Sequence, residues 1–166
     1  MGIDFYVQLN RRIRADRTKR RLVLLLNELL TYLIVLLYAV GLIMAFAGGN
    51  LRVTLMLVLV PLTTFVVARL LRMMLKVPRP YRAAPIKPLV RKKKRSYSLP
   101  SCHVTSAFVI GTCMMAISMT FPGIPVLIAA CALAFLRVLS GAHYIRDAAV
   151  GACIGILGGL VPFVIM

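Results

Sequence analysis

Long apolar segments alternate with short polar segments along the chain, and this alternation predicts the fold. Each apolar segment comes close to the ~20 residues that an α-helix needs to cross ~30 Å of hydrocarbon. We therefore expect an all-α integral membrane bundle of about five transmembrane helices, with no linker and no internal repeat. The expected spans are Leu22–Ala47, Leu51–Leu75, Ser101–Thr120, Gly123–Leu139 and Tyr144–Met166. The start of the fourth is poorly defined, because prolines flank Gly123.

The first 21 residues have a different pattern. Ile3, Tyr6, Val7 and Ile13 recur near helical spacing, and seven basic residues lie between positions 11 and 21. This pattern predicts an amphipathic helix on the membrane surface. The apolar stretch that follows is too long for the core of a signal peptide, so we expect it to remain as an anchor. The chain then divides into a basic N-terminal segment, 1–21, and a transmembrane domain, 22–166.

Composition agrees with a membrane protein, since 61% of the residues are hydrophobic and the mean hydropathy is +0.91. A soluble domain of this size could not bury so much apolar surface. Small residues in the last span, Gly151, Gly155 and Gly159, are spaced four apart and suit close helix packing. We interpret them as packing positions within the chain, and a homodimer is the alternative. The four cysteines have no metal-binding spacing and are expected to be reduced.

The net charge of +17 is distributed asymmetrically. With the spans above, 20 of the 21 basic residues lie at one face and only Arg52 lies at the other. The positive-inside rule makes that face cytoplasmic, and we expect a bacterial cytoplasmic membrane. The run Arg91–Arg95 is then a loop beside anionic headgroups rather than a nucleic-acid site. Arg69, Lys76, Arg82 and Lys87 are interpreted as headgroup or topology residues.

Polar residues that could bind a substrate or take part in catalysis lie at the same face. Each lies at the polar end of an apolar segment, although the segments are far apart in sequence: Arg72, Arg79, Ser101, Cys102, His103, Arg137, His143 and Asp147. His103 and His143 are the only histidines of the chain. Ionisable residues at such positions are expensive in a membrane and are by default a functional site. We therefore predict one active site at this interface.

The residue types indicate phosphoryl chemistry. Arginines present paired donors that match phosphate oxygens, and a helix beginning at Ser101 adds backbone N–H groups. His143 can act as nucleophile with Asp147, four residues on along the same helix face, holding its ring, while His103 serves as general acid. Only Asp147 among the four acidic residues falls in this cluster, too few for a two-metal site. We expect no metal and no cofactor.

The spacing of these residues resembles a known signature. Three motifs occur in order, Arg72-x6-Arg79-Pro80, Pro100-Ser101-Cys102-His103 and Arg137-x5-His143-x3-Asp147. They resemble the type 2 phosphatidic acid phosphatase family, whose usual motifs are Lys-x6-Arg-Pro, Pro-Ser-Gly-His and Ser-Arg-x5-His-x3-Asp. The chain departs from this pattern at Arg72, at Cys102 and at Leu136, which replace lysine, glycine and serine.

The resemblance implies roles for the matching residues. His143 would be the nucleophile, Asp147 would orient it, and His103 would protonate the leaving group; Arg72, Arg79, Ser101, Cys102 and Arg137 would surround the phosphate. It also implies a metal-independent phosphatase acting through a phosphohistidine on a lipid phosphate or diphosphate. Candidates are phosphatidylglycerol phosphate, phosphatidic acid and polyprenyl (di)phosphates such as undecaprenyl diphosphate. The alternative is a lipid-phosphate binding or transport-associated protein that kept the pocket without turnover.

Overall fold

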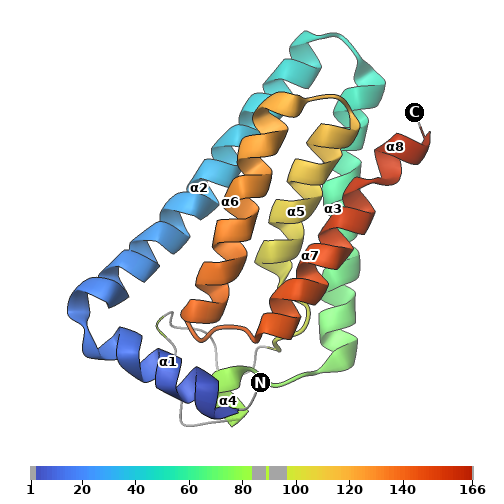
Figure 1. The fold of residues 1–166 in the computed structure, drawn as a ribbon. Helices are drawn as coiled ribbons and strands as arrows, with labels where there is room; N and C mark the ends of the chain where they lie inside the picture. Colours follow the sequence, from blue (N-terminus) through green and yellow to red (C-terminus); the bar gives the residue numbers. More distant parts are fainter. Residues whose placement is uncertain (1–2, 84–88, 90–96, 166) are drawn as a thin grey trace.

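The structure is a computed structural model that describes residues 3–83, 89 and 97–165 (Figure 1). All regular structure within these residues is helical, which confirms the predicted fold class. The helices in chain order are α1 Ile3–Ala15, α2 Arg17–Ala47, α3 Leu51–Leu75, α4 Pro80–Ala83, α5 Cys102–Ala116, α6 Thr120–Leu139, α7 Ile145–Gly159 and α8 Val161–Ile165. The basic run Arg91–Arg95 and Lys87 lie outside the described residues.

Long helices that follow one another in the chain run antiparallel, and the two chain ends lie at opposite ends of the bundle (Figure 1). Helix α1 lies across the lower end in this view and packs against α2. Within the described part of the chain, four segments are long and apolar enough to cross a membrane: Arg17–Ala47, Leu51–Leu75, Thr120–Leu139 and Ile145–Ile165, which combines α7 and α8. Helix α5 is shorter.

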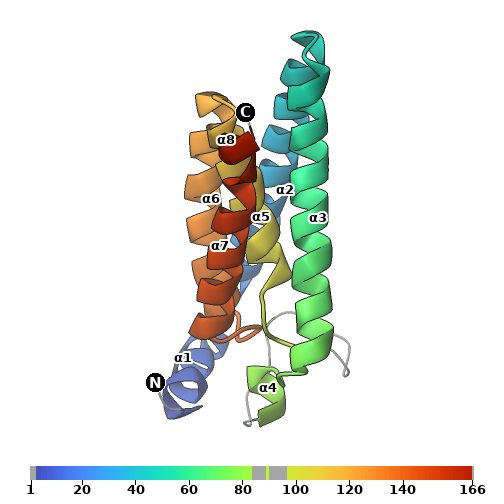
Figure 2. The same ribbon diagram turned by 90° about the vertical axis from the view of Figure 1, so that its right-hand side faces the viewer.

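The predicted third span, Ser101–Thr120, was too long. Helix α5 has 15 residues and ends at Ala116, and Ser118 follows with a left-handed φ of 63°. The position of α5 explains why a short helix suffices there. It packs against α3, α6 and α7 (Figure 2), and nine of its residues are buried. Protein rather than lipid therefore surrounds most of α5, so its length need not match the hydrocarbon thickness.

The first transmembrane helix begins earlier than the predicted Leu22. Asp16 caps α2, because its side chain accepts hydrogen bonds from the backbone N–H groups of Thr18, at 2.8 Å, and Lys19, at 3.2 Å. An aspartate at this position satisfies helix donors that otherwise have no partner. The basic residues from Arg17 to Arg21 therefore form the exposed first turns of α2. Secondary structure does not break at the expected boundary between residues 21 and 22.

The glycines of α7 pack against α5, as predicted. A Cβ atom added to Gly155 would lie 2.7 Å from the backbone oxygen of Thr105, and one added to Gly159 would lie 2.9 Å from the backbone nitrogen of Cys113. A Cβ atom added to Gly151 would lie 3.0 Å from the backbone oxygen of Ser101. These glycines let the two backbones approach closely along α5, from Ser101 at its start to Cys113 near its end. The glycine stripe is therefore used within the chain.

Candidate active site

Four separate helix ends carry the predicted site residues to one end of the bundle. Arg72 lies in the last turn of α3 and Arg137 in the last turn of α6. Ser101 caps α5, and Asp147 lies in the first turn of α7. Because long helices that follow one another in the chain run antiparallel, the ends of α3 and α6 lie at the same end of the bundle as the starts of α5 and α7 (Figure 1). The remaining predicted residues adjoin these ends: Arg79, Cys102, His103 and His143.

His143 is held by Ser98, a residue that the sequence analysis did not single out. The Nδ1 atom of His143 lies 3.0 Å from the backbone oxygen of Ser98 and 3.4 Å from the Ser98 hydroxyl. His143 is 1% exposed. A carbonyl oxygen can only accept a hydrogen bond, so the contact places the proton of the neutral imidazole on Nδ1. The lone pair is then on Nε2, the other ring nitrogen.

Asp147 does not hold His143 in the way the sequence analysis expected. His143 precedes α7 and lies in the loop before it, so the two residues do not share a helix face. The nearest Asp147 oxygen, Oδ2, is 3.7 Å from His143 Nδ1. That oxygen accepts hydrogen bonds from the backbone N–H of Tyr144, at 2.9 Å, and from the Ser98 hydroxyl. Asp147 therefore caps α7, lies within ion-pair distance of His143 and is also joined to it through Ser98.

The start of α5 is tied directly to α7. The backbone N–H of Ser101 donates to the backbone oxygen of Asp147 at 3.0 Å. Ser101 is fully buried, and its hydroxyl has no hydrogen-bond partner within the described residues. This bond fixes the beginning of α5, with its unpaired helix N–H groups, beside the loop that carries His143.

Arg79 and Arg137 are buried arginines beside this loop. Arg79 donates from Nη1 to the backbone oxygen of Ala142 at 3.2 Å, one residue before His143. Burial lowers the pKa of the Arg79 guanidinium. Arg137 is close enough to Arg79 for their charges to interact. The Nε atoms of both arginines are buried with no hydrogen-bond partner in the described part of the chain. Buried donors of this kind call for an acceptor, and an anion supplies several.

Arg72 contacts the second motif. Its Nε donates to the backbone oxygen of Pro100 at 2.9 Å, and its Nη2 donates to the same oxygen. The fork geometry of arginine makes this paired contact possible, which a lysine in its place could not reproduce. The departure from the usual lysine therefore fits the structure, because Arg72 ties the end of α3 to the residue before Ser101.

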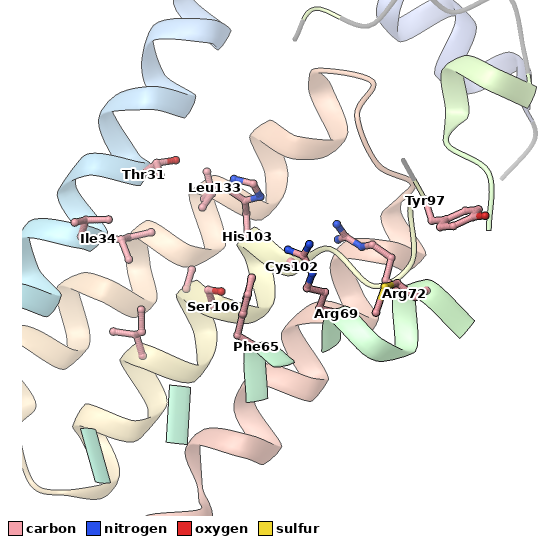
Figure 3. Close-up of a pocket in the computed structure, with 14 residues that line it drawn as sticks. Thr31, Ile34, Phe65, Arg69, Arg72, Tyr97, Cys102, His103, Ser106 and Leu133 are labelled. Carbon is pink, nitrogen blue, oxygen red and sulfur yellow. The ribbon is translucent and has the colours of Figure 1, made fainter. Parts of the chain in front are cut away.

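A cavity of about 730 Å³ opens beside these residues, between α2, α3, α5 and α6 (Figure 3). Arg69, Arg72, Cys102 and His103 lie at its polar end. Its other walls are mainly apolar: Ile34, Val35, Phe65, Ala107, Ile110 and Leu133. Arg79, Arg137, His143 and Asp147 do not line this cavity. The structure thus places the predicted site residues in two adjoining groups, one along the cavity and one buried, joined by Pro100 and Ser101.

The sequence analysis did not assign two residues to the site that the structure places beside it, Ser98 and Arg69. Ser98 left only a weak signal, a serine near the second motif in a loop of no regular pattern. Arg69 was interpreted as a topology residue because of its charge, yet it lines the cavity one helical turn from Arg72. Only the packing of α3 against α5 shows which way its side chain points (Figure 3).

The fold and the buried cluster together define an integral membrane protein with buried arginines and histidine at one end of a helical bundle. A sequence profile described as "PAP2 superfamily" matches residues 49–166, which include all three motifs. The chain belongs to this superfamily, the one that its motifs resemble. No curated protein sequence matches it.

Solved structures agree with this fold. The chain is similar to the first transmembrane PAP2-type phosphatidylglycerolphosphate phosphatase from Bacillus subtilis, with a TM-score of 0.74 and 19% identity over 96% of this chain and 83% of that one. It is also similar to Aquifex aeolicus LpxE, with a TM-score of 0.60 and 24% identity over 86% of this chain and 92% of that one. At these identities the likeness concerns the fold.

Proposed function

We propose that the protein is a phosphatase that removes phosphate from a membrane lipid without a metal ion. One observation carries this proposal. The Nε atoms of Arg79 and Arg137 and the hydroxyl of Ser101 are buried hydrogen-bonding groups without partners in the described residues. All three belong to the motifs that the family resemblance assigns to phosphate. A phosphoryl group between them would satisfy these donors and balance the two buried positive charges.

His143 supplies the nucleophile in this proposal. Its Nε2 lone pair attacks the phosphorus of the lipid phosphate, and the bond between phosphorus and the leaving oxygen breaks as the phosphorus–nitrogen bond forms. Protonated His103 gives a proton to the leaving oxygen, so the lipid departs as an alcohol or a lipid monophosphate. The Ser98 carbonyl and the Asp147 carboxylate stabilise the positive charge that develops on the imidazole.

Water completes the reaction. Neutral His103 takes a proton from the attacking water, the oxygen bonds to phosphorus, and the phosphorus–nitrogen bond breaks. Inorganic phosphate leaves, and both histidines return to their starting protonation states. The arginines stabilise the charge spread over the phosphoryl oxygens in both steps.

A second candidate function is lipid-phosphate binding without turnover. One observation favours it, because His143 is 1% exposed and does not line the cavity that holds His103. A nucleophile in that position needs a local opening before substrate reaches it. The departures at Cys102 and Leu136 leave both histidines in place, so we prefer the enzyme.

The expected orientation guides the choice of lipid. A cytoplasmic site favours phosphatidylglycerol phosphate, phosphatidic acid or a cytoplasmic polyprenyl phosphate, whereas an outward site would favour undecaprenyl diphosphate. The similar structure from Bacillus subtilis is a phosphatidylglycerolphosphate phosphatase, which supports testing that lipid first.

Phosphate release by the purified protein in detergent tests this proposal. The assay contains EDTA and compares wild type with the His143→Ala variant. We expect release by wild type only. Lipid binding without release by wild type would support the binding protein instead, and loss of activity in EDTA that added metal restores would contradict metal independence.

A further inference from the structure

Arg69 is a cavity residue that the three motifs do not include. It lies on α3 in the same stripe as Phe65, Arg72 and Met73, and all four line the cavity. The spacing of these residues is that of one helix face. Arg69 therefore lies between the polar end of the cavity, marked by Arg72, and its apolar part, marked by Phe65. Figure 3 shows the side chains of Arg69 and Arg72 extending from α3 into this space.

The contact between Arg72 and Pro100 holds the end of α3 beside the start of α5. Helices α3 and α5 run antiparallel (Figure 1), and Arg72 donates to the backbone oxygen of Pro100. Arg69 lies about one turn of α3 before this contact, and His103 lies in the first turn of α5 just after it. Both line the same cavity.

His103 is the group that protonates the leaving oxygen in the proposed function. A charge that lines the same cavity as His103, between Arg72 and the apolar wall, therefore faces the part of the substrate that lies just beyond the leaving oxygen, before the apolar chain begins. Arg69 is also close enough to Arg72 for their charges to repel, so an anion between them or beside them would relieve that repulsion. In the proposed function the transferred phosphoryl group faces Arg72, Arg79 and Arg137, so a monophosphate offers Arg69 no anion of its own.

We propose that Arg69 determines specificity by binding a second phosphoryl group, the one that stays on the lipid. The preferred substrates then carry two phosphoryl groups, as a lipid diphosphate or as phosphatidylglycerol phosphate. Phosphatidic acid, which has one, is a poorer substrate. This inference rests on the proposed function and names its substrate class. A bidentate arginine on a desolvated phosphate contributes about tenfold or more in binding.

The test compares kcat/KM for a lipid diphosphate, phosphatidylglycerol phosphate and phosphatidic acid. We expect Arg69→Ala to lower the preference for one or both two-phosphoryl lipids over phosphatidic acid by about tenfold. Arg69→Lys should restore part of it, because it keeps the charge. Arg52→Ala removes an arginine at the opposite end of the bundle and serves as the matched control. Equal losses on all three lipids, or no loss, would overturn the inference.

A second readout separates this inference from the proposed function. In the His143→Ala background, a two-phosphoryl lipid should raise Tm more than phosphatidic acid at equal concentration, and adding Arg69→Ala should remove that difference. If wild type releases no phosphate but this binding preference exists, the proposed enzyme activity fails while the role of Arg69 stands. If wild type is active and Arg69→Ala leaves both preferences unchanged, only the role of Arg69 is refuted.

Discussion

The backbone oxygen of Ser98 lies 3.0 Å from Nδ1 of His143, nearer than any oxygen of Asp147. The Ser98 hydroxyl donates to the Asp147 carboxylate and lies 3.4 Å from the same ring nitrogen. One serine in a loop thus joins two residues of the third motif. The loop itself is attached to the end of α3, because Ser98 donates its backbone N–H to the backbone oxygen of Val77 at 2.9 Å. The orientation of the proposed nucleophile therefore depends on a segment outside the motifs.

Replacing Ser98 should impair turnover more than binding. Ser98→Ala removes the hydroxyl that occupies a buried Asp147 oxygen, and an unsatisfied buried acceptor costs about 1–3 kcal/mol. We expect kcat to fall about tenfold with KM nearly unchanged. Ser98→Thr, which keeps a hydroxyl, should recover part of the rate, and Thr63→Ala removes an exposed hydroxyl as a control. A rise in KM alone would show that Ser98 acts on substrate binding.

A covalent phosphoenzyme should form on His143. Rapid acid-free quenching of wild type with a lipid labelled in its terminal phosphate should trap label that is stable in base and lost in acid, as expected for a phosphorus–nitrogen bond. His143→Ala should carry no label. His103→Ala should keep more activity on substrates with good leaving groups than on alkyl esters, because such leaving groups need no proton. Equal labelling of wild type and His143→Ala would refute the covalent mechanism.

Cys102 offers a chemical probe of the cavity. It stands where the family motif has glycine, it is 8% exposed, and it lines the cavity beside His103. A bulky maleimide on Cys102 should inhibit, and substrate or vanadate should slow the modification. Cys102→Gly should keep or raise activity and lose this sensitivity. Full activity of protein shown by mass spectrometry to carry the maleimide at Cys102 would place the thiol outside the substrate path.

Gly155 should be intolerant of a side chain. A Cβ atom there would meet the backbone oxygen of Thr105 and the Cβ atom of Phe108, both at 2.7 Å. Gly155→Ala must therefore push α7 away from α5, at a cost of about 1–3 kcal/mol. We expect a lower Tm in detergent and reduced activity. Ala149→Val enlarges an exposed position on the same helix and should change neither Tm nor activity. An unchanged Tm for Gly155→Ala would contradict the close packing.

The site should face the cytoplasm. In a cysteine-free background, Arg11→Cys places a thiol at an exposed position of α1, and Leu51→Cys places one at the opposite end of the bundle. A membrane-impermeant thiol reagent should label position 51 in intact cells and position 11 only after permeabilisation. The reverse pattern would put the site outside and shift the preferred substrate toward undecaprenyl diphosphate.

The sequence by itself determined the fold class and the family, and it named the candidate site residues that the fold gathers at one end of the bundle. An apolar segment of about 20 residues can hardly form anything other than a membrane helix, because its backbone N–H and C=O groups must be paired within the segment in lipid. The first and third motifs each join the end of one helix to the start of the next, and the second lies at the start of α5, so short segments bring all three to the same end of the bundle. Positions such as Arg79, Arg137 and His143 could therefore be named from sequence. The end of α5 could not be predicted from the sequence, because α5 is surrounded by α3, α6 and α7 rather than by lipid.

Only the tertiary structure decided how these residues contact one another. The spacing of His143 and Asp147 predicted a pair on one helix face, but the helix begins at Ile145, so the chain before it is free to orient His143 toward Ser98. The direction of Arg69 was likewise fixed by the packing of α3 against α5. Contacts between segments distant in sequence depend on how helices approach and rotate, and local spacing carries no information about that rotation.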